Sequence, residues 1–148
     1  MKKTFASLHA RAFCHATEDL DKVKKAMENA LGQTEIKVSK TEGVHGNPIA
    51  VLEASVVDSD GIAEFFGKLS EGDLSELLAT LGERVDDGCN LFLRIDKQEA
   101  YKGLQRLATD GDVISIRLRV RAYPAKREIA YAAAKKYVEE ELLGRSSS

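Results

Sequence analysis

The segment Gly43–Pro48 does most to restrict how this 148-residue chain can fold. It is rich in Gly, Asn and Pro, and it separates two stretches, 34–42 and 49–57, that have the residue pattern of β-strands. A connection of this length is suited to a hairpin, in which two neighbouring strands run in opposite directions. The chain is therefore expected to contain at least one antiparallel strand pair.

Three further strands are predicted, from alternating residues at 4–16 and 113–122 and from a short apolar run at 89–95. The segments between them carry apolar residues at helical spacing and begin with residues that favour helix N-termini. The helices are expected after Thr17 as far as Leu31, around 62–69, from Asp73 with Glu76 through Leu81, from Asp96 through Leu107, and from Pro124 to Gly144.

These elements predict an α+β fold with a mostly antiparallel sheet of about five strands packed against helices. The chain length suits one domain, and a composition of 43% apolar and 31% charged residues is that of a globular protein. We expect a single domain over residues 1–144, followed by a disordered tail at 145–148. One face of the sheet is expected to be covered by helices and the other to be partly open.

Composition and motifs argue against several classes of protein. No apolar run approaches the roughly 20 residues that span a bilayer, and no signal-peptide pattern begins the chain, so a cytoplasmic protein with no membrane contact is expected. His9 and His15 would lie about 20 Å apart along an extended strand, too far to share a metal ion. Since no catalytic template matches either, we expect a non-enzymatic protein without metal or cofactor.

The strand at 113–122 carries the most informative charge pattern. Alternation places Arg117, Arg119 and Arg121 on one face, with about 6.5–7 Å between neighbours. That spacing is close to the spacing of phosphates along a nucleic-acid strand, so a polyanion would relieve the repulsion among the arginines. The alternative is a solvated face whose arginines pair with carboxylates on neighbouring strands.

Lys126 and Arg127 extend this pattern into the expected last helix. They lie in its first turn, where the helix dipole disfavours positive charge. A phosphate bound at the helix N-terminus by Lys126, Arg127 and the nearby Arg121 would account for them. Alternatively, Glu128 neutralises the pair locally.

The strand at 4–16 allows two interpretations. Phe5, Arg11, Phe13 and His15 share a face by alternation, and interleaved aromatic and basic side chains form a surface on which single-stranded RNA stacks. Alternatively, Phe5 and Phe13 belong to the core and the smaller, Ala-rich face lies under a helix. The direction in which this strand faces therefore decides whether base stacking can join phosphate binding.

Several motifs distributed over nearly the whole chain resemble one known family. They are 13–19 with Lys22-Val23, 45–49, 93–98, and Tyr123-Pro124 ahead of Arg127-Glu128. Together they are similar to an archaeal family of predicted RNA-binding, exosome-associated proteins. The resemblance implies a fold like that of the large-subunit ribosomal protein that binds 5S rRNA, with an antiparallel sheet backed by helices.

The leading hypothesis is therefore an RNA-binding protein that contacts the phosphate backbone, with exosome components as further partners. The alternative is a protein-protein adaptor or a self-associating homodimer that does not bind RNA directly. The residues expected to contact RNA are Arg94, Lys97, Arg117, Arg119, Arg121, Lys126 and Arg127, and a second set of candidate contacts comprises Arg11, His15, Lys37, His45 and Asn47.

Overall fold

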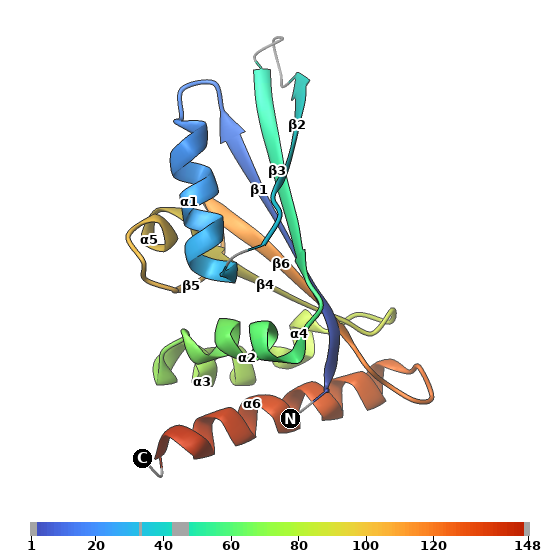
Figure 1. Ribbon diagram of the computed structural model, residues 1–148. Helices are drawn as coiled ribbons and strands as arrows, with labels where there is room; N and C mark the ends of the chain where they lie inside the picture. The colour runs from blue at the N-terminus through green and yellow to red at the C-terminus, as the bar shows by residue number, and fades with distance from the viewer. Residues whose placement is uncertain (1–2, 33, 43–47, 147–148) are drawn as a thin grey trace.

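The computed structural model describes residues 3–32, 34–42 and 48–146. Within that part of the chain, six strands form one antiparallel sheet in the order β2-β3-β1-β6-β4-β5 (Figure 1). The predicted α+β class and the antiparallel pair on either side of Gly43–Pro48 are therefore confirmed. The strands are β1 (Phe5–His15), β2 (Lys37–Glu42), β3 (Pro48–Val56), β4 (Asn90–Asp96), β5 (Leu107–Ala108) and β6 (Val113–Val120).

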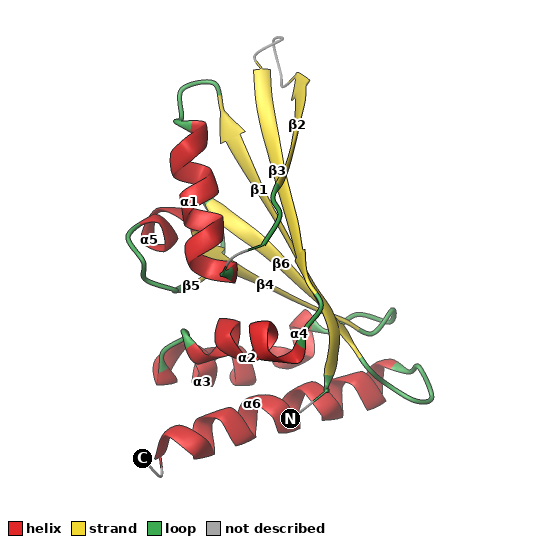
Figure 2. Cartoon of the chain, in the orientation of Figure 1, coloured by secondary structure: helices red, strands yellow, loops and turns green. Residues whose placement is uncertain are grey.

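The helices gather on one side of the sheet and around its lower end, as Figure 2 shows. One group, α1 with α5, lies beside the upper part of the sheet, and α2, α3, α4 and α6 lie at the lower end. Their bounds are α1 (Leu20–Leu31), α2 (Ser59–Gly67), α3 (Glu71–Ala79), α4 (Leu81–Arg84), α5 (Lys97–Tyr101) and α6 (Arg127–Ser146).

The core lies between the helices and one face of the sheet. Small residues on β1, Ala10 and Ala12, are fully buried where α1 packs against the strand. At the lower end, Phe5 stacks on Phe66 of α2 at 5.3 Å between ring centroids and meets Tyr137 of α6 edge-on at 4.9 Å. The Ala-rich face is thus covered by a helix, as one of the two interpretations of this strand expects.

A break in the alternation of β1 resolves the direction of its aromatic side chains. Phe5 is paired with Val120 and Leu8 with Leu118, so β1 has one residue more than β6 over this stretch. Such a bulge reverses which face each later residue occupies. Phe5 is consequently buried with Leu8, whereas Phe13 is 45% exposed on the opposite face. The interpretation that exposes the aromatic side chains is therefore correct for Phe13, and the interpretation that places them in the core is correct for Phe5.

Several expected helix boundaries are wrong. Asp19 rather than Thr17 caps α1, because its carboxylate accepts a hydrogen bond from the Asp21 N–H. Ser70, not Asp73, caps α3 in the same way. Leu107 belongs to the short strand β5 instead of a helix, which raises the number of strands from the expected five to six in the described part of the chain.

The last helix is displaced along the chain from its expected bounds. It begins at Arg127, three residues after Pro124, and it continues past Gly144 to Ser146. Arg145, expected in a disordered tail, is helical, and its guanidinium donates hydrogen bonds to the Leu69 and Phe66 carbonyls. These bonds join the end of α6 to the end of α2.

Candidate nucleic-acid interface

The sheet face opposite the core carries polar, basic and aromatic side chains. We call it the open face, and its residues follow from the strand register and the alternation of burial along each strand. They are Ser7, His9, Arg11, Phe13 and His15 of β1, Lys37, Ser39 and Thr41 of β2, Ile49, Val51, Glu53 and Ser55 of β3, Asn90, Phe92, Arg94 and Asp96 of β4, and Val113, Ser115, Arg117 and Arg119 of β6.

The register brings arginines from three strands together. Ser115 of β6 lies directly opposite Arg11 on one side and Arg94 on the other. Two residues along β6, Arg117 lies opposite His9 and Phe92. Directly opposed Cβ atoms in a sheet are about 4.5–5.5 Å apart, so these side chains form one continuous patch. The predicted basic strand is thus the centre of a wider surface.

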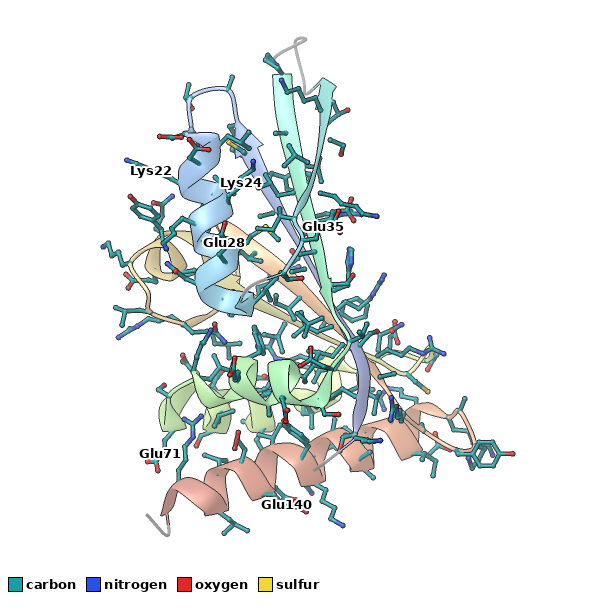
Figure 3. All side chains as sticks on the ribbon, viewed as in Figure 1. Lys22, Lys24, Glu28, Glu35, Glu71 and Glu140 are labelled. Atoms are coloured by element: carbon teal, nitrogen blue, oxygen red, sulfur yellow. The ribbon has the colours of Figure 1, made fainter. Side chains whose placement is uncertain are left out.

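Charge on the open face is strongly biased. Five of its side chains are cationic (Arg11, Lys37, Arg94, Arg117 and Arg119), whereas two of its described residues are carboxylates, Glu53 on β3 and Asp96 at the end of β4. The chain as a whole has a formal net charge of −2. Acidic side chains project from the helical layer, among them Glu28, Glu71 and Glu140 (Figure 3). The open face therefore carries an excess of positive charge, although the protein as a whole is slightly acidic.

The alternative of carboxylate pairing accounts for only part of this surface. Glu53 Oε2 lies 3.0 Å from His9 Nε2 and 3.6 Å from an Arg11 guanidinium nitrogen. Among the described residues, Arg117 and Arg119 have no carboxylate within ion-pair distance. Asp96, at the end of β4, uses its carboxylate to accept the Glu99 N–H and caps α5, as predicted. The two central arginines thus remain available to a ligand.

The structure adds an aromatic side chain that the sequence interpretation did not single out. Phe92 is 42% exposed on the open face and lies directly opposite Arg117. The segment 89–95 was expected to be an apolar strand, which hid the alternation of buried Leu91 and Leu93 with exposed Phe92 and Arg94. A stricter comparison of odd and even positions would have revealed it. Phe13, on β1, is a second exposed ring on this face.

Lys97 lies in the interior and not on the predicted RNA surface. Its side chain is only 3% exposed, with Nζ 2.9 Å from Glu18 Oε2 and 2.7 Å from Asp112 Oδ1. Nζ also donates a hydrogen bond to the Phe13 carbonyl at 2.8 Å. Burial lowers the pKa of this ammonium, but the hydrogen bonds and charges of Asp112 and Glu18 outweigh burial and raise the pKa above its usual value. Lys97 is therefore a buried cation that joins β1, α5 and the start of α1.

Arg127 also has internal partners. Its Nε donates to the Val85 carbonyl at 3.0 Å, and another guanidinium nitrogen donates to the Gly82 carbonyl, so the side chain holds the turn at α4. Arg121 and Lys126 are exposed, one immediately after β6 and the other immediately before α6. The expected cluster at the helix N-terminus is thus reduced to these two side chains.

Only part of the second set of expected RNA contacts can be placed in the structure. Arg11, His15 and Lys37 lie on the open face, on the two strands β1 and β2. His45 and Asn47 lie outside the described residues. Of the twelve residues expected to contact RNA, six therefore share the open face: Arg11, His15, Lys37, Arg94, Arg117 and Arg119.

The thiol of Cys14 on β1 lies away from the open face, in surroundings that make it less reactive. Cys14 is buried, and burial together with Glu18 raises the pKa of its thiol, so the thiolate is disfavoured. The described residues contain no group of three or more His, Cys, Asp or Glu side chains that could hold a metal ion. In the same part of the chain, every helix is too short or too polar to cross a bilayer.

Comparison with known proteins places the chain among archaeal relatives. A family model described as RNA binding matches residues 7–120. A protein of Pyrococcus abyssi that is named an RNA-binding protein is 36% identical over 145 residues, which cover 91% of this chain and 94% of that protein. The solved structure of a DUF54 protein from Methanothermobacter thermautotrophicus is 34% identical, covers 90% of this chain and 98% of that chain, and has a TM-score of 0.81.

A more distant solved structure shows that the fold persists as the sequence diverges. A DUF54 protein from Sulfolobus solfataricus is 23% identical and has a TM-score of 0.73 over 94% of this chain and 98% of its own. The family match covers most of the chain, including all of β3, β4 and β6 and most of β1. The chain therefore belongs to the DUF54 family of archaeal proteins, whose family model is described as RNA binding.

Proposed function

We propose that this protein binds RNA by laying the phosphate backbone across the open face, without catalysing a reaction. The observation that carries the proposal is the excess of positive charge on the described part of one surface, where five cationic side chains accompany two carboxylates, in a chain with net charge −2. A protein with this charge balance gains little from unspecific attraction to nucleic acid. A local basic surface is therefore the feature that can bind a polyanion.

The geometry of the arginines suits phosphate contacts. Arg117 and Arg119 are two residues apart on β6, a separation of roughly 6.5–7 Å in a strand. A guanidinium offers two parallel N–H groups to a phosphate, which makes arginine well suited to this contact. Arg121 and Lys126 continue the path beyond the end of β6 toward α6. Lys97 and Arg127, which have internal partners, would support this surface rather than contact RNA.

Replacement of the two central arginines tests the proposal. The double variant Arg117→Ala with Arg119→Ala should bind labelled RNA about tenfold or more weakly at low salt. The slope of log affinity against log salt should fall by about 1 for each phosphate that the variant no longer binds. The matched control is Lys25→Ala with Lys135→Ala, which removes the same charge from exposed positions on α1 and α6. Equal affinities of the two double variants would refute the proposal.

Two further expectations concern partners. The resemblance to exosome-associated proteins leads us to propose that the bound RNA is undergoing processing, with exosome subunits nearby. Recovery of exosome subunits with the tagged protein after nuclease treatment would support a direct contact, and their loss on nuclease treatment would indicate contact through RNA only. The alternative of a self-associating adaptor predicts a homodimer, which light scattering after size-exclusion chromatography would detect.

A further inference from the structure

A cavity of about 440 Å³ opens from the open face at the edge of β4. Its origin is a gap in strand pairing. The short strand β5 pairs only with Arg94 and Ile95, and Val85 bridges to Leu91, so the intervening edge of β4 has no neighbouring strand among the described residues. The ends of α3 and α4 form the facing wall. Its volume lies within the range of sites that bind small ligands.

Phe92 lines the cavity at its junction with the open face. Its ring is 42% exposed, and its direct neighbour on β6 is Arg117. Arg94 and Ser115 also belong both to the cavity and to the open face. A strand of RNA whose phosphates contact the arginines would therefore carry its bases past the mouth of this cavity.

The rest of the lining combines the apolar residues Leu93, Ala108 and Ile116 with polar side chains, some of which are held by hydrogen bonds. The Arg84 Nε donates to Thr80 Oγ1 at 2.8 Å, and an Arg94 guanidinium nitrogen donates to the Thr109 carbonyl at 2.7 Å. Each guanidinium has further N–H groups, which can donate to the oxygen and nitrogen acceptors of a base. Glu76 and Glu83 add carboxylate acceptors for base N–H groups. An aromatic ring beside donors and acceptors is the chemistry that holds one nucleobase.

We infer that this cavity binds a single unpaired nucleobase, which stacks on Phe92 while the adjoining phosphates contact Arg94 and Arg117. The inference rests on the proposed function and narrows the ligand to single-stranded RNA. In an A-form duplex the bases are stacked inside the helix and their edges are paired, so none can enter the cavity. The open face alone would bind the phosphates of either form.

The test compares Phe92→Ala with Tyr101→Ala, which removes a ring of similar exposure from α5 on the helical side. One stacked base contributes about 1–3 kcal/mol, so Phe92→Ala should weaken binding of a short single-stranded RNA by roughly 5- to 150-fold. Binding of a duplex of the same sequence should change less than about twofold, because no base of a duplex reaches the ring. Phe92→Tyr, which keeps the ring, should restore the affinity for the single strand.

The salt dependence separates this inference from the proposed function. Phe92→Ala removes no charge, so its salt slope should equal that of the wild type, whereas the double arginine variant should have a smaller slope. If the arginine variant weakens binding but Phe92→Ala and Phe92→Leu both retain wild-type affinity for single strands, the cavity inference is wrong and the proposed function stands. If neither the arginines nor Phe92 affects binding, both fail.

Discussion

Glu53 is the residue that most limits the positive charge of the open face. Its carboxylate contacts both His9 and Arg11, so it engages an arginine that could otherwise bind phosphate. On the other side of β3, Lys37 of β2 lies directly opposite Glu53 in the register. A carboxylate at the centre of a basic surface lowers the affinity for every polyanion, and this suggests that tight binding to RNA in general is not favoured.

Replacement of this carboxylate should therefore strengthen RNA binding. Glu53→Gln keeps the side-chain shape, removes the negative charge and releases Arg11, so we expect about 3- to 10-fold tighter binding at low salt. The matched control is Glu28→Gln on α1, which makes the same charge change on the helical side (Figure 3). Fluorescence anisotropy with labelled RNA measures both variants. Equal gains for the two would show that net charge, and not the open face, governs binding.

Among the basic residues, the exposure of Arg117 and Arg119 could be predicted from the sequence, whereas the burial of Lys97 could not. Alternation correctly placed Arg117 and Arg119 on a solvent-exposed face, because period-two burial is a local property of a strand. The burial of Lys97 was not predictable in this way. It depends on Glu18 and Asp112, which are distant in sequence and meet Lys97 only when β1, α1 and α5 pack together.

At the level of elements, Lys97 connects the upper end of the sheet to two helices. Its ammonium contacts Glu18 just before α1, Asp112 just before β6 and the carbonyl of Phe13 on β1. The pKa of Asp112 is lowered, because the hydrogen bonds from Lys97 and Gln98 outweigh the effect of burial, which raises it. The network fixes the end of β1 that presents Phe13 and His15 on the open face.

Removal of the buried cation should destabilise the fold without abolishing RNA binding. Lys97→Met leaves two carboxylates without their partner, and because both are partly exposed we expect a loss of about 2–3 kcal/mol in the free energy of unfolding. Urea denaturation followed by circular dichroism measures this loss. Below the denaturation midpoint, RNA affinity should remain within a few-fold of the wild type. A stability change below about 0.5 kcal/mol would contradict the role of this network, since exposed pairs contribute about that much.

The boundaries of elements show why the remaining fold details escaped prediction. The bulge in β1 depends on its register with β6, and no residue near Phe5 marks it in the sequence. Strand β5 has only two residues, Leu107 and Ala108, and its pairing with β4 is set by the packing of the whole sheet. Pro124 favoured a helix start by its fixed φ, yet α6 begins at Arg127, whose guanidinium bonds to the carbonyls of Gly82 and Val85.

At the scale of the whole molecule, the antiparallel sheet separates structural from ligand-binding roles. One face buries the core under the helices, and the other presents arginines, two exposed phenylalanines and polar side chains. The hairpin, the strand alternation and the helical stripes were sufficient to predict this two-layer arrangement. The membership of the DUF54 family and the description of its family model agree with an RNA ligand. A cytoplasmic location, absence of catalysis and similarity to the 5S-rRNA-binding ribosomal protein remain predictions.

The most direct test of the central claim is to map where RNA touches the protein. Ultraviolet crosslinking of bound single-stranded RNA, followed by mass spectrometry of the crosslinked peptides, identifies contacts in the wild-type protein without any substitution. The open face predicts crosslinks in β1, β4 and β6, especially at Phe13 and Phe92, and loss of these crosslinks at high salt. Crosslinks confined to the exposed surfaces of α1 and α6 would contradict the account.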